Sequence, residues 1–231
     1  MKRIIGRRHL TADQYGDYGN YKVPCVDITR LFVGGLPVPH RQAWASSVID
    51  EWLIAGKVTY KALDVGTNDG LLCAIIASKH LSPRDDSSDT IYVDGIEIHD
   101  SAYQASSELS KTMCEKGFKM HVHKVLFEDY ETPIKYDVIF AFEMLEHTID
   151  PLFCIEKMYD LLEIGGHIFL TVPEEYGMFG VQDKNLFHYW TSTVQSLISV
   201  LFCDDRKWHI EQLHEEDGLI HMIVQKKSYM A

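Results

Sequence analysis

Two kinds of hydrophobic pattern alternate along the chain after about residue 58. Short runs that are apolar at nearly every position predict strands covered on both faces. Segments with apolar residues three and four positions apart predict helices that cover those strands. The predicted strands are 59–65, 91–98, 121–125, 136–142 and 167–173. The predicted helices are 71–76, 103–114, 152–162 and 194–201.

The two ends of the chain differ from this alternating middle. Residues 43–53 predict an amphipathic helix that leads into the first strand, and residues 208–213 and 219–225 predict a closing hairpin around an Asp217-Gly218 turn. Residues 1–40 have many turn signals and no sustained period, which predicts an N-terminal arm or lid. We therefore expect an arm at 1–40 and a single domain at 41–231.

Candidate chemistry begins in the string LDVGTNDG, from Leu63 to Gly70, between the first strand and its helix. Glycines at 66 and 70 allow tight turning, and we expect the amides that open the helix to face polar ligand groups. The second strand ends in an acid, Glu97, whose carboxylate could accept hydrogen bonds from both hydroxyls of a ribose. Together these residues predict a site for an adenosine cofactor.

The type of adenosine cofactor follows from what stands beside the glycines. A dinucleotide-binding turn would read G-x-G-x-x-G, which this turn does not. Asp64, two residues before Gly66, would repel a diphosphate but could meet an ammonium group or bound water. Asp64, Gly66, Gly70 and Glu97 together resemble the first two motifs of the class I S-adenosylmethionine-dependent methyltransferases.

A second resemblance lies further along the chain. Residues 143–147 read EMLEH, an Asp-Pro pair follows at 150–151, and LLEIGG follows at 161–166. The Asp is a plausible N-cap and the Pro suits the first helical position, while the two glycines would end the helix. This order is similar to the branch with an E-x-x-E-H loop that includes the ubiquinone-pathway O-methyltransferases. The resemblance covers about residues 62–173.

The resemblance implies an α/β fold, a Rossmann-like doubly wound sheet of seven mostly parallel strands with the last strand antiparallel. It implies that S-adenosyl-L-methionine lies over the carboxyl ends of the strands. Many relatives have a third glycine where this chain has Asn68. The expected cofactor-binding residues are Asp64, Gly66, Thr67, Asn68, Gly70, Glu97, Leu126, Phe127 and Phe142.

Two roles are open for the E-x-x-E-H string. His147 is the candidate general base, oriented by Glu143 and Glu146, because a neutral imidazole can take a proton from an acceptor at neutral pH. Alternatively, Glu143, Glu146 and His147 bind a divalent metal ion with His188 as a fourth ligand, as the resemblance to small-RNA 2′-O-methyltransferases implies. The other histidines show no ligand spacing.

Charge and composition bear on the acceptor. A formal net charge of -12 disfavours a polyanion such as RNA, although Lys2, Arg3, Arg7 and Arg8 form a basic patch. The five cysteines lack paired spacing and are expected to be reduced, mostly in the core. No membrane span and no signal peptide are expected, so the predicted location is cytoplasmic.

These observations predict an S-adenosylmethionine-dependent methyltransferase that acts on the oxygen of a small hydroxylated molecule. An RNA ribose or a sugar is the alternative acceptor. A cofactor-binding domain without catalysis is the alternative class of protein.

Overall fold

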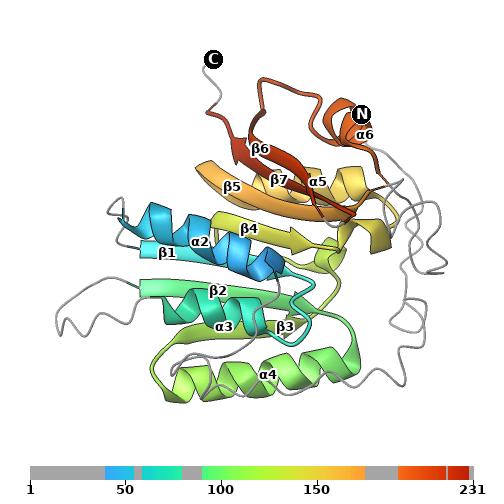
Figure 1. Cartoon of the computed structure of the whole chain (residues 1–231). Helices are drawn as coiled ribbons and strands as arrows, with labels where there is room; N and C mark the ends of the chain where they lie inside the picture. Colours follow the sequence, from blue (N-terminus) through green and yellow to red (C-terminus); the bar gives the residue numbers. More distant parts are fainter. Residues whose placement is uncertain (1–39, 55–58, 80–89, 175–191, 217, 229–231) are drawn as a thin grey trace.

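A seven-stranded sheet organises the chain, with strand order β3-β2-β1-β4-β5-β7-β6 (Figure 1). The computed structural model describes residues 40–54, 59–79, 90–174, 192–216 and 218–228. Strands β1 to β5 pair in parallel, and β7 pairs antiparallel with both β5 and β6. The strand order reverses between β1 and β4. The predicted α/β fold, with its mostly parallel sheet and antiparallel last strand, is confirmed.

The described elements have the following bounds. The strands are β1 Thr59–Val65, β2 Thr90–Glu97, β3 Lys119–Lys124, β4 Tyr136–Phe142, β5 Leu162–Pro173, β6 Trp208–Glu216 and β7 Leu219–Lys226. The α-helices are α2 His40–Ile54, α3 Leu71–Ser78, α4 Asp100–Glu115, α5 Pro151–Leu161 and α6 Val194–Ser196. Short turns η2 Phe127–Asp129 and η3 Leu145–His147 are 3-10 helical, and η4 Leu197–Leu201 is π-helical.

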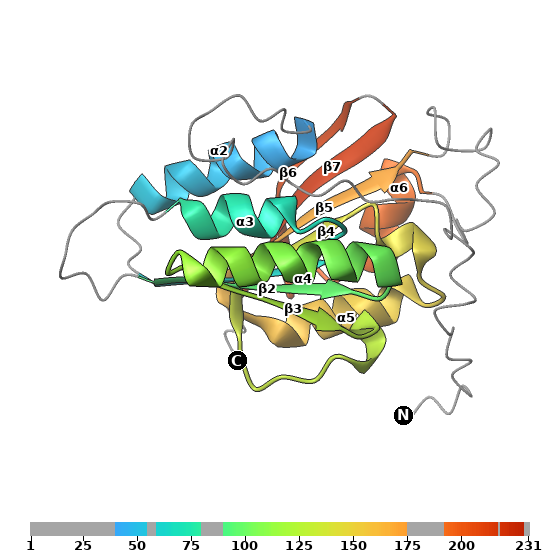
Figure 2. The ribbon, with the colours of Figure 1, turned by 90° about the horizontal axis from the view of Figure 1, so that it is seen from below.

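Helices cover both faces of the sheet, as the strands' apolar character requires. Helices α2, α3 and α4 lie together on one face and α5 lies on the other (Figure 2). Phe140 and Phe169 are fully buried on the α2 side, whereas Tyr136 and Ile139 are fully buried on the α5 side. The alternation of side chains along a strand divides the core into these two layers.

Local signals set several boundaries as predicted. The Asp150 side chain accepts a hydrogen bond of 3.0 Å from the Phe153 amide, and Pro151 stands in the first turn of α5. The helix nevertheless ends at Leu161, so Leu162 begins β5 and does not close the helix. The predicted helix at 194–201 is one short α-turn followed by the π-turn η4.

Two further predictions, the N-terminal arm and the burial of the cysteines, are only partly tested or only partly correct. Residues 1–39, which make up nearly all of the predicted arm, lie outside the described residues. Of the four described cysteines, Cys73 and Cys154 are buried, but Cys114 and Cys203 are exposed, so the expectation of a mainly core location holds for only half of them. Among the helices that the structure describes, none has the length and apolar character to cross a membrane.

Candidate active site

The turn after β1 has the backbone that its glycines predict. Gly66 and Gly70 have φ angles of 78° and 79°, which L-residues with a Cβ rarely adopt. Asn68 between them is also left-handed, with φ of 51°. Asparagine tolerates this conformation better than most residues because its short polar side chain can form local hydrogen bonds. At the position where many relatives have a third glycine, this chain therefore has a residue that tolerates the same left-handed backbone.

Backbone amides of this turn are already paired within the chain. The Gly66 and Thr67 amides both donate to the Ile96 carbonyl, at 2.9 and 3.0 Å. The Asn68 amide donates to Glu97 Oε2 at 2.9 Å, and the Gly70 amide donates to the Thr67 carbonyl at 2.9 Å. At the start of the helix, the Leu71 amide also has a partner, because it donates to Asp69 Oδ1 at 3.0 Å. The expectation that the amides opening the helix face a ligand is thus wrong for Gly70 and Leu71. The hydrogen bonds of the Gly66, Thr67 and Asn68 amides tie the turn to β2.

Asp64 is buried beneath the turn and does not project from it. Its side chain is 4% exposed and lies against Thr67 and Cys73, with Cys73 Sγ at 3.6 Å from Oδ2. Thr67 Oγ1 in turn lies 3.1 Å from Cys73 Sγ. Burial raises the pKa of Asp64 from 3.8 to about 7, and the hydrogen bonds of Thr67 and Cys73 oppose that rise. Asp64 and Thr67 therefore support the turn from below.

A glycine in β2 makes room for this packing. Gly95 pairs with Asp64 in the sheet, and a Cβ on Gly95 would come within 3.0 Å of Thr67 Cγ2 and 3.2 Å of Cys73 Sγ. Gly70 is equally constrained, because its Cβ would lie 3.0 Å from Ser106 Cβ in α4. Gly95 was not among the predicted site residues, although an isolated glycine within a strand signals close approach of other groups.

Glu97 occupies the predicted position at the carboxyl end of β2, and its carboxylate is fixed by backbone groups. Oε1 accepts from the Ile98 and His99 amides at 2.8 Å each, and Oε2 accepts from the Asn68 amide. A carboxylate has about four lone-pair positions, so one remains on Oε2. Burial raises the pKa of Glu97, while these three hydrogen bonds lower it. Accepting two ribose hydroxyls at once would require the Asn68 amide to move away.

The loop after β4 begins with a strained residue. Glu143 has φ of 49°, and its amide donates to the Thr171 carbonyl at 2.9 Å. A left-handed glutamate costs on the order of 1 kcal/mol or more, and such strain concentrates at functional sites. The loop also lies next to the turn after β1, because a Cβ on Gly66 would be 3.4 Å from Met144 Cγ. The E-x-x-E-H loop and the glycine turn therefore meet.

The predicted metal ligands in this loop do not converge. Glu146 is 1% exposed, whereas Glu143 and His147 are half-buried. The turn η3 has about three residues per turn, so successive side chains point in different directions. Among the described residues, the group with three donor atoms within 4.8 Å is elsewhere, and it includes none of the three. His188, the fourth candidate ligand, lies outside the described residues.

Three apolar residues were predicted to contact the cofactor. Phe127 is 4% exposed and packs in the core, with Lys157 Nζ at 5.6 Å from its ring centroid. Leu126 is half-buried beside it. Phe142, at the end of β4, is also half-buried. Leu126 and Phe142 therefore have surface to offer a ligand, but Phe127 has almost none.

A row of side chains continues from Phe142 across the carboxyl edge of the sheet. Phe142 pairs with Thr171 in β5, Thr171 with His221 in β7, and His221 with His214 in β6. The Trp44 ring of α2 lies over this row, with its centroid 6.1 Å from that of Phe142 and 5.3 Å from that of His221. Our sequence analysis missed this row because its members are neighbours only through the strand register.

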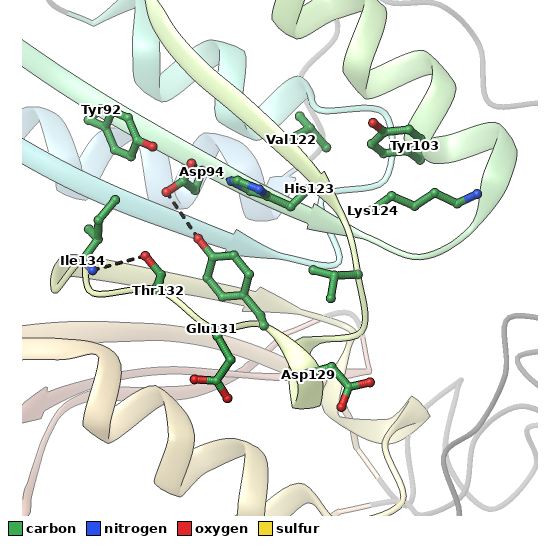
Figure 3. A pocket seen from close by; sticks show the side chains of 12 residues that line it. Tyr92, Asp94, Tyr103, Val122, His123, Lys124, Asp129, Glu131, Thr132 and Ile134 are labelled. Carbon is green, nitrogen blue, oxygen red and sulfur yellow. Dashed lines mark hydrogen bonds and ion pairs between the residues drawn. The ribbon is translucent and has the colours of Figure 1, made fainter.

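A cavity of about 610 Å³ lies elsewhere, beside the outer strands β2 and β3 (Figure 3). Its lining includes Asp94 and His123, whose Oδ1 and Nε2 atoms are 3.0 Å apart. Asp94 is fully buried and also accepts from the Tyr136 hydroxyl at 2.6 Å. None of the predicted cofactor residues lines this cavity. We interpret the Asp94 contacts as a satisfied structural network.

Comparison with known proteins adds independent information. The chain matches the methyltransferase domain family over residues 40–219. It is 32% identical over 136 residues to a ubiquinone biosynthesis O-methyltransferase of Pseudomonas savastanoi pv. phaseolicola, and this match covers 58% of the chain and 50% of that protein. The chain thus spans about half the length of the curated relatives it matches.

Solved structures share the fold at low sequence identity. An S-adenosylmethionine-dependent methyltransferase from Clostridium acetobutylicum superposes with a TM-score of 0.61 and 10% identity, over 87% of this chain and 97% of that one. The [4+2]-cyclase SpnF superposes with the same TM-score and 14% identity, over 87% and 92%. Since proteins with different activities share this fold, the assignment of activity depends on the family match and the site.

Proposed function

The chain belongs to the class I S-adenosylmethionine-dependent methyltransferase family, and from that premise we propose that it methylates a hydroxyl oxygen of a small molecule. The similarity to ubiquinone biosynthesis O-methyltransferases supports oxygen as the methylated atom. The fuller activity of those longer proteins is not carried over, because half of their length has no counterpart in the match.

The residues at the carboxyl ends of β1 and β2 fit the cofactor. Glu97 offers a buried carboxylate with one free acceptor position, which suits a ribose hydroxyl. Gly66 and Asn68 are exposed at the turn above it, where they would line the methionine portion. Leu126 would contact the adenine. Asp64 and Thr67 would act indirectly, by holding the turn in place.

Bound S-adenosyl-L-methionine supplies an electrophilic methyl carbon, which forms a bond to the acceptor oxygen as its bond to sulfur breaks with the electron pair remaining on sulfur. The acceptor must lose its hydroxyl proton, and we assign His147 as the base that accepts it. His147 is half-buried in the loop after β4, which adjoins the turn after β1. We assign Glu143 as the residue that orients it, because Glu143 is half-buried like His147 whereas Glu146 is buried in the protein interior.

The main support for a small acceptor is the row of side chains Phe142, Thr171, His221 and His214, over which the Trp44 ring packs. These side chains are aromatic, hydroxyl or imidazole groups and include no lysine or arginine. Of the row, Phe142 and His214 are open to solvent, whereas Thr171 and His221 are buried, so Phe142 and His214 are the members that could contact an acceptor. An aromatic and an imidazole group suit a small uncharged or aromatic molecule better than a phosphate backbone, which requires cationic partners. The net charge of -12 acts in the same direction.

A direct assay of methyl transfer tests the proposal. The full chain is incubated with S-adenosylmethionine and a panel of phenols, sugars and short RNAs, and S-adenosylhomocysteine formation is measured by mass spectrometry. We expect turnover with a small hydroxylated compound and none with RNA. Turnover confined to RNA would contradict the acceptor class, and cofactor binding with no product from any acceptor would favour a domain without methyl transfer.

The variant His147→Gln separates the chemical step from binding. We expect it to keep its affinity for S-adenosylmethionine in calorimetry and to lose about 100-fold or more in turnover, a usual contribution of a general base. Unchanged turnover would remove His147 from the proposed role.

A further inference from the structure

We propose that His214, Glu216 and His221 form a binding site for a divalent transition-metal ion on the hairpin of β6 and β7. Each residue offers one donor atom, and the three atoms lie within 4.8 Å of one another. The two imidazole rings are stacked, with centroids 4.8 Å apart and planes at 12°. His214 Nε2 lies 3.8 Å from Glu216 Oε2. This group is distinct from the E-x-x-E-H loop.

The strand register brings the three residues together. His214 pairs directly with His221 across the antiparallel ladder, and Glu216 is two residues beyond His214 on the same face of β6. A bulge between Ile210 and Gln212 sets this pairing. Without the extra residue, Leu213 would stand opposite His221, and His214 would face the other side of the sheet. The bulge therefore directs an imidazole, instead of an isobutyl group, toward His221.

The donor set matches the chemistry of transition ions. Two imidazoles and one carboxylate suit zinc, iron, cobalt or nickel better than magnesium or calcium, which prefer oxygen ligands. Zinc-nitrogen bonds of about 2.1 Å place tetrahedral donor atoms roughly 3.3 Å apart. The donor atoms lie within 4.8 Å of one another, so they would need to approach by up to about 1.5 Å, and the His214 ring would need to turn out of its stack on His221. Side-chain rotation can supply both changes at His214 and Glu216, because both are about two-fifths exposed.

Solvent can reach one side of the group while the other side is fixed. His221 is 2% exposed and held under the Trp44 ring, whose centroid lies 5.3 Å from its own. Trp44 also contacts His214, at 5.9 Å between centroids. One ligand is thus preorganised in the sheet, and the two others can close over an ion that enters from solvent.

The three ligands lie close enough to the end of β4 for a bound ion to act on an acceptor there. His221 is two strands from Phe142 in the same row, or about 10 Å at 4.8 Å per strand. Three protein ligands leave at least one coordination position open, as in catalytic zinc sites. We infer that this position takes an oxygen of the acceptor and orients it toward the end of β4. This role rests on the proposed function, whereas metal binding itself does not.

Metal titration of the untagged full chain tests the site. After chelator treatment and dialysis, Co²⁺ is added while its visible absorption is followed, and Zn²⁺ is then used to displace it. We expect one Co²⁺ per chain, with a spectrum typical of nitrogen and oxygen ligands. His221→Phe keeps an aromatic ring under Trp44 and should weaken binding by about 100-fold or more, and Glu216→Gln, an exposed change, by about 10-fold or more.

His209→Phe is the matched control, because His209 is an exposed histidine of the same strand outside the group. We expect it to bind Co²⁺ as the unaltered chain does. The site is overturned if the unaltered chain binds no Co²⁺, or if Glu216→Gln and a folded His221→Phe both bind as tightly as the control. Equal loss in the control and in His221→Phe would also overturn it, because His209 lies outside the group.

The methyl-transfer assay described above, run on the same samples, separates this inference from the proposed function. Metal binding that responds to these variants, in a chain that methylates no hydroxylated compound, would keep the ion site and remove only its role toward an acceptor. Methyl transfer without any metal binding would keep the proposed function and remove the ion site.

Discussion

Replacing Asp64 with asparagine should change how the stability of this protein depends on pH. Asp64 is buried, and its pKa of about 7 in the folded chain compares with 3.8 for an ordinary aspartate. Burial is the main cause, and the neighbouring charges of Asp69 and Glu97 add to it. Between these two pH values the folded chain holds a proton that the unfolded chain has released.

The sign and size of the effect follow from linkage. A raised carboxyl pKa gives stability that is fully present below pH 3.8 and is lost as pH rises toward 7. At 1.36 kcal/mol for each pH unit, the total loss is about 4 kcal/mol, of which about 3 kcal/mol falls between pH 5 and pH 8. Asparagine has nearly the same shape and no charge to bury. Relative to the unaltered chain, Asp64→Asn should therefore gain about 3 kcal/mol across that interval.

Urea denaturation followed by circular dichroism at pH 5, 6, 7 and 8, without cofactor, measures this difference. Subtracting the two chains removes the contribution of titrating groups that do not interact with Asp64. Asp205→Asn is the control, since it makes the same substitution at an exposed position. A difference between Asp64→Asn and the unaltered chain that stays constant from pH 5 to pH 8 would refute the reasoning.

Three further predictions concern backbone constraints in the fold. Gly70→Ala should lower the free energy of unfolding by about 2–4 kcal/mol in urea denaturation, because backbone strain at φ of 79° adds to overpacking against Ser106. The control Gly117→Ala, with φ of 92° and nothing within 4 Å of the added Cβ, should cost only the strain of about 1–2 kcal/mol. Equal losses in the two variants would contradict the packing argument. Glu97→Gln should weaken S-adenosylmethionine binding by about 10-fold or more in calorimetry and lower the free energy of unfolding by about 1–3 kcal/mol. The reason is that an amide has one acceptor oxygen for the three backbone donors that the carboxylate now accepts from. Unchanged affinity would show that Glu97 does not bind the cofactor. Asp150→Ala should lower the free energy of unfolding by about 1 kcal/mol through loss of the helix cap, and a change below 0.5 kcal/mol would show that the cap contributes little.

The parts of the site that depend on neighbouring residues in sequence were predictable. Glycine at 66 and 70 specified the left-handed backbone of the turn, and the acid at 97 marked the end of β2. Asp150 and Pro151 likewise placed the start of α5. In each of these places, the chemistry of one or two residues decides the local conformation.

The direction of individual side chains was harder to predict. Asp64 was expected to meet a ligand but faces inward, because Gly95 in the neighbouring strand leaves space for Thr67 and Cys73 around it. Glu146 was expected either to orient His147 or to bind a metal ion, but it is buried in the 3-10 turn. These outcomes depend on pairing between strands and on loop geometry, neither of which is encoded in the spacing of the residues themselves.

The register of the last hairpin was likewise hidden. One bulged residue decides which side chain of β6 stands opposite His221, and no turn residue or periodicity in the sequence predicts this bulge. For this reason, histidines that show no ligand spacing along the chain become neighbours in space.

The contacts of Trp44 also bear on the order in which the chain folds. This ring joins α2, before the first strand, to His221 in the last strand, so it links segments near opposite ends of the described chain. Closing so long a loop is entropically costly, and such contacts form late unless other structure has shortened the separation. The edge of the sheet beyond β4 should therefore be completed only after the central strands have paired.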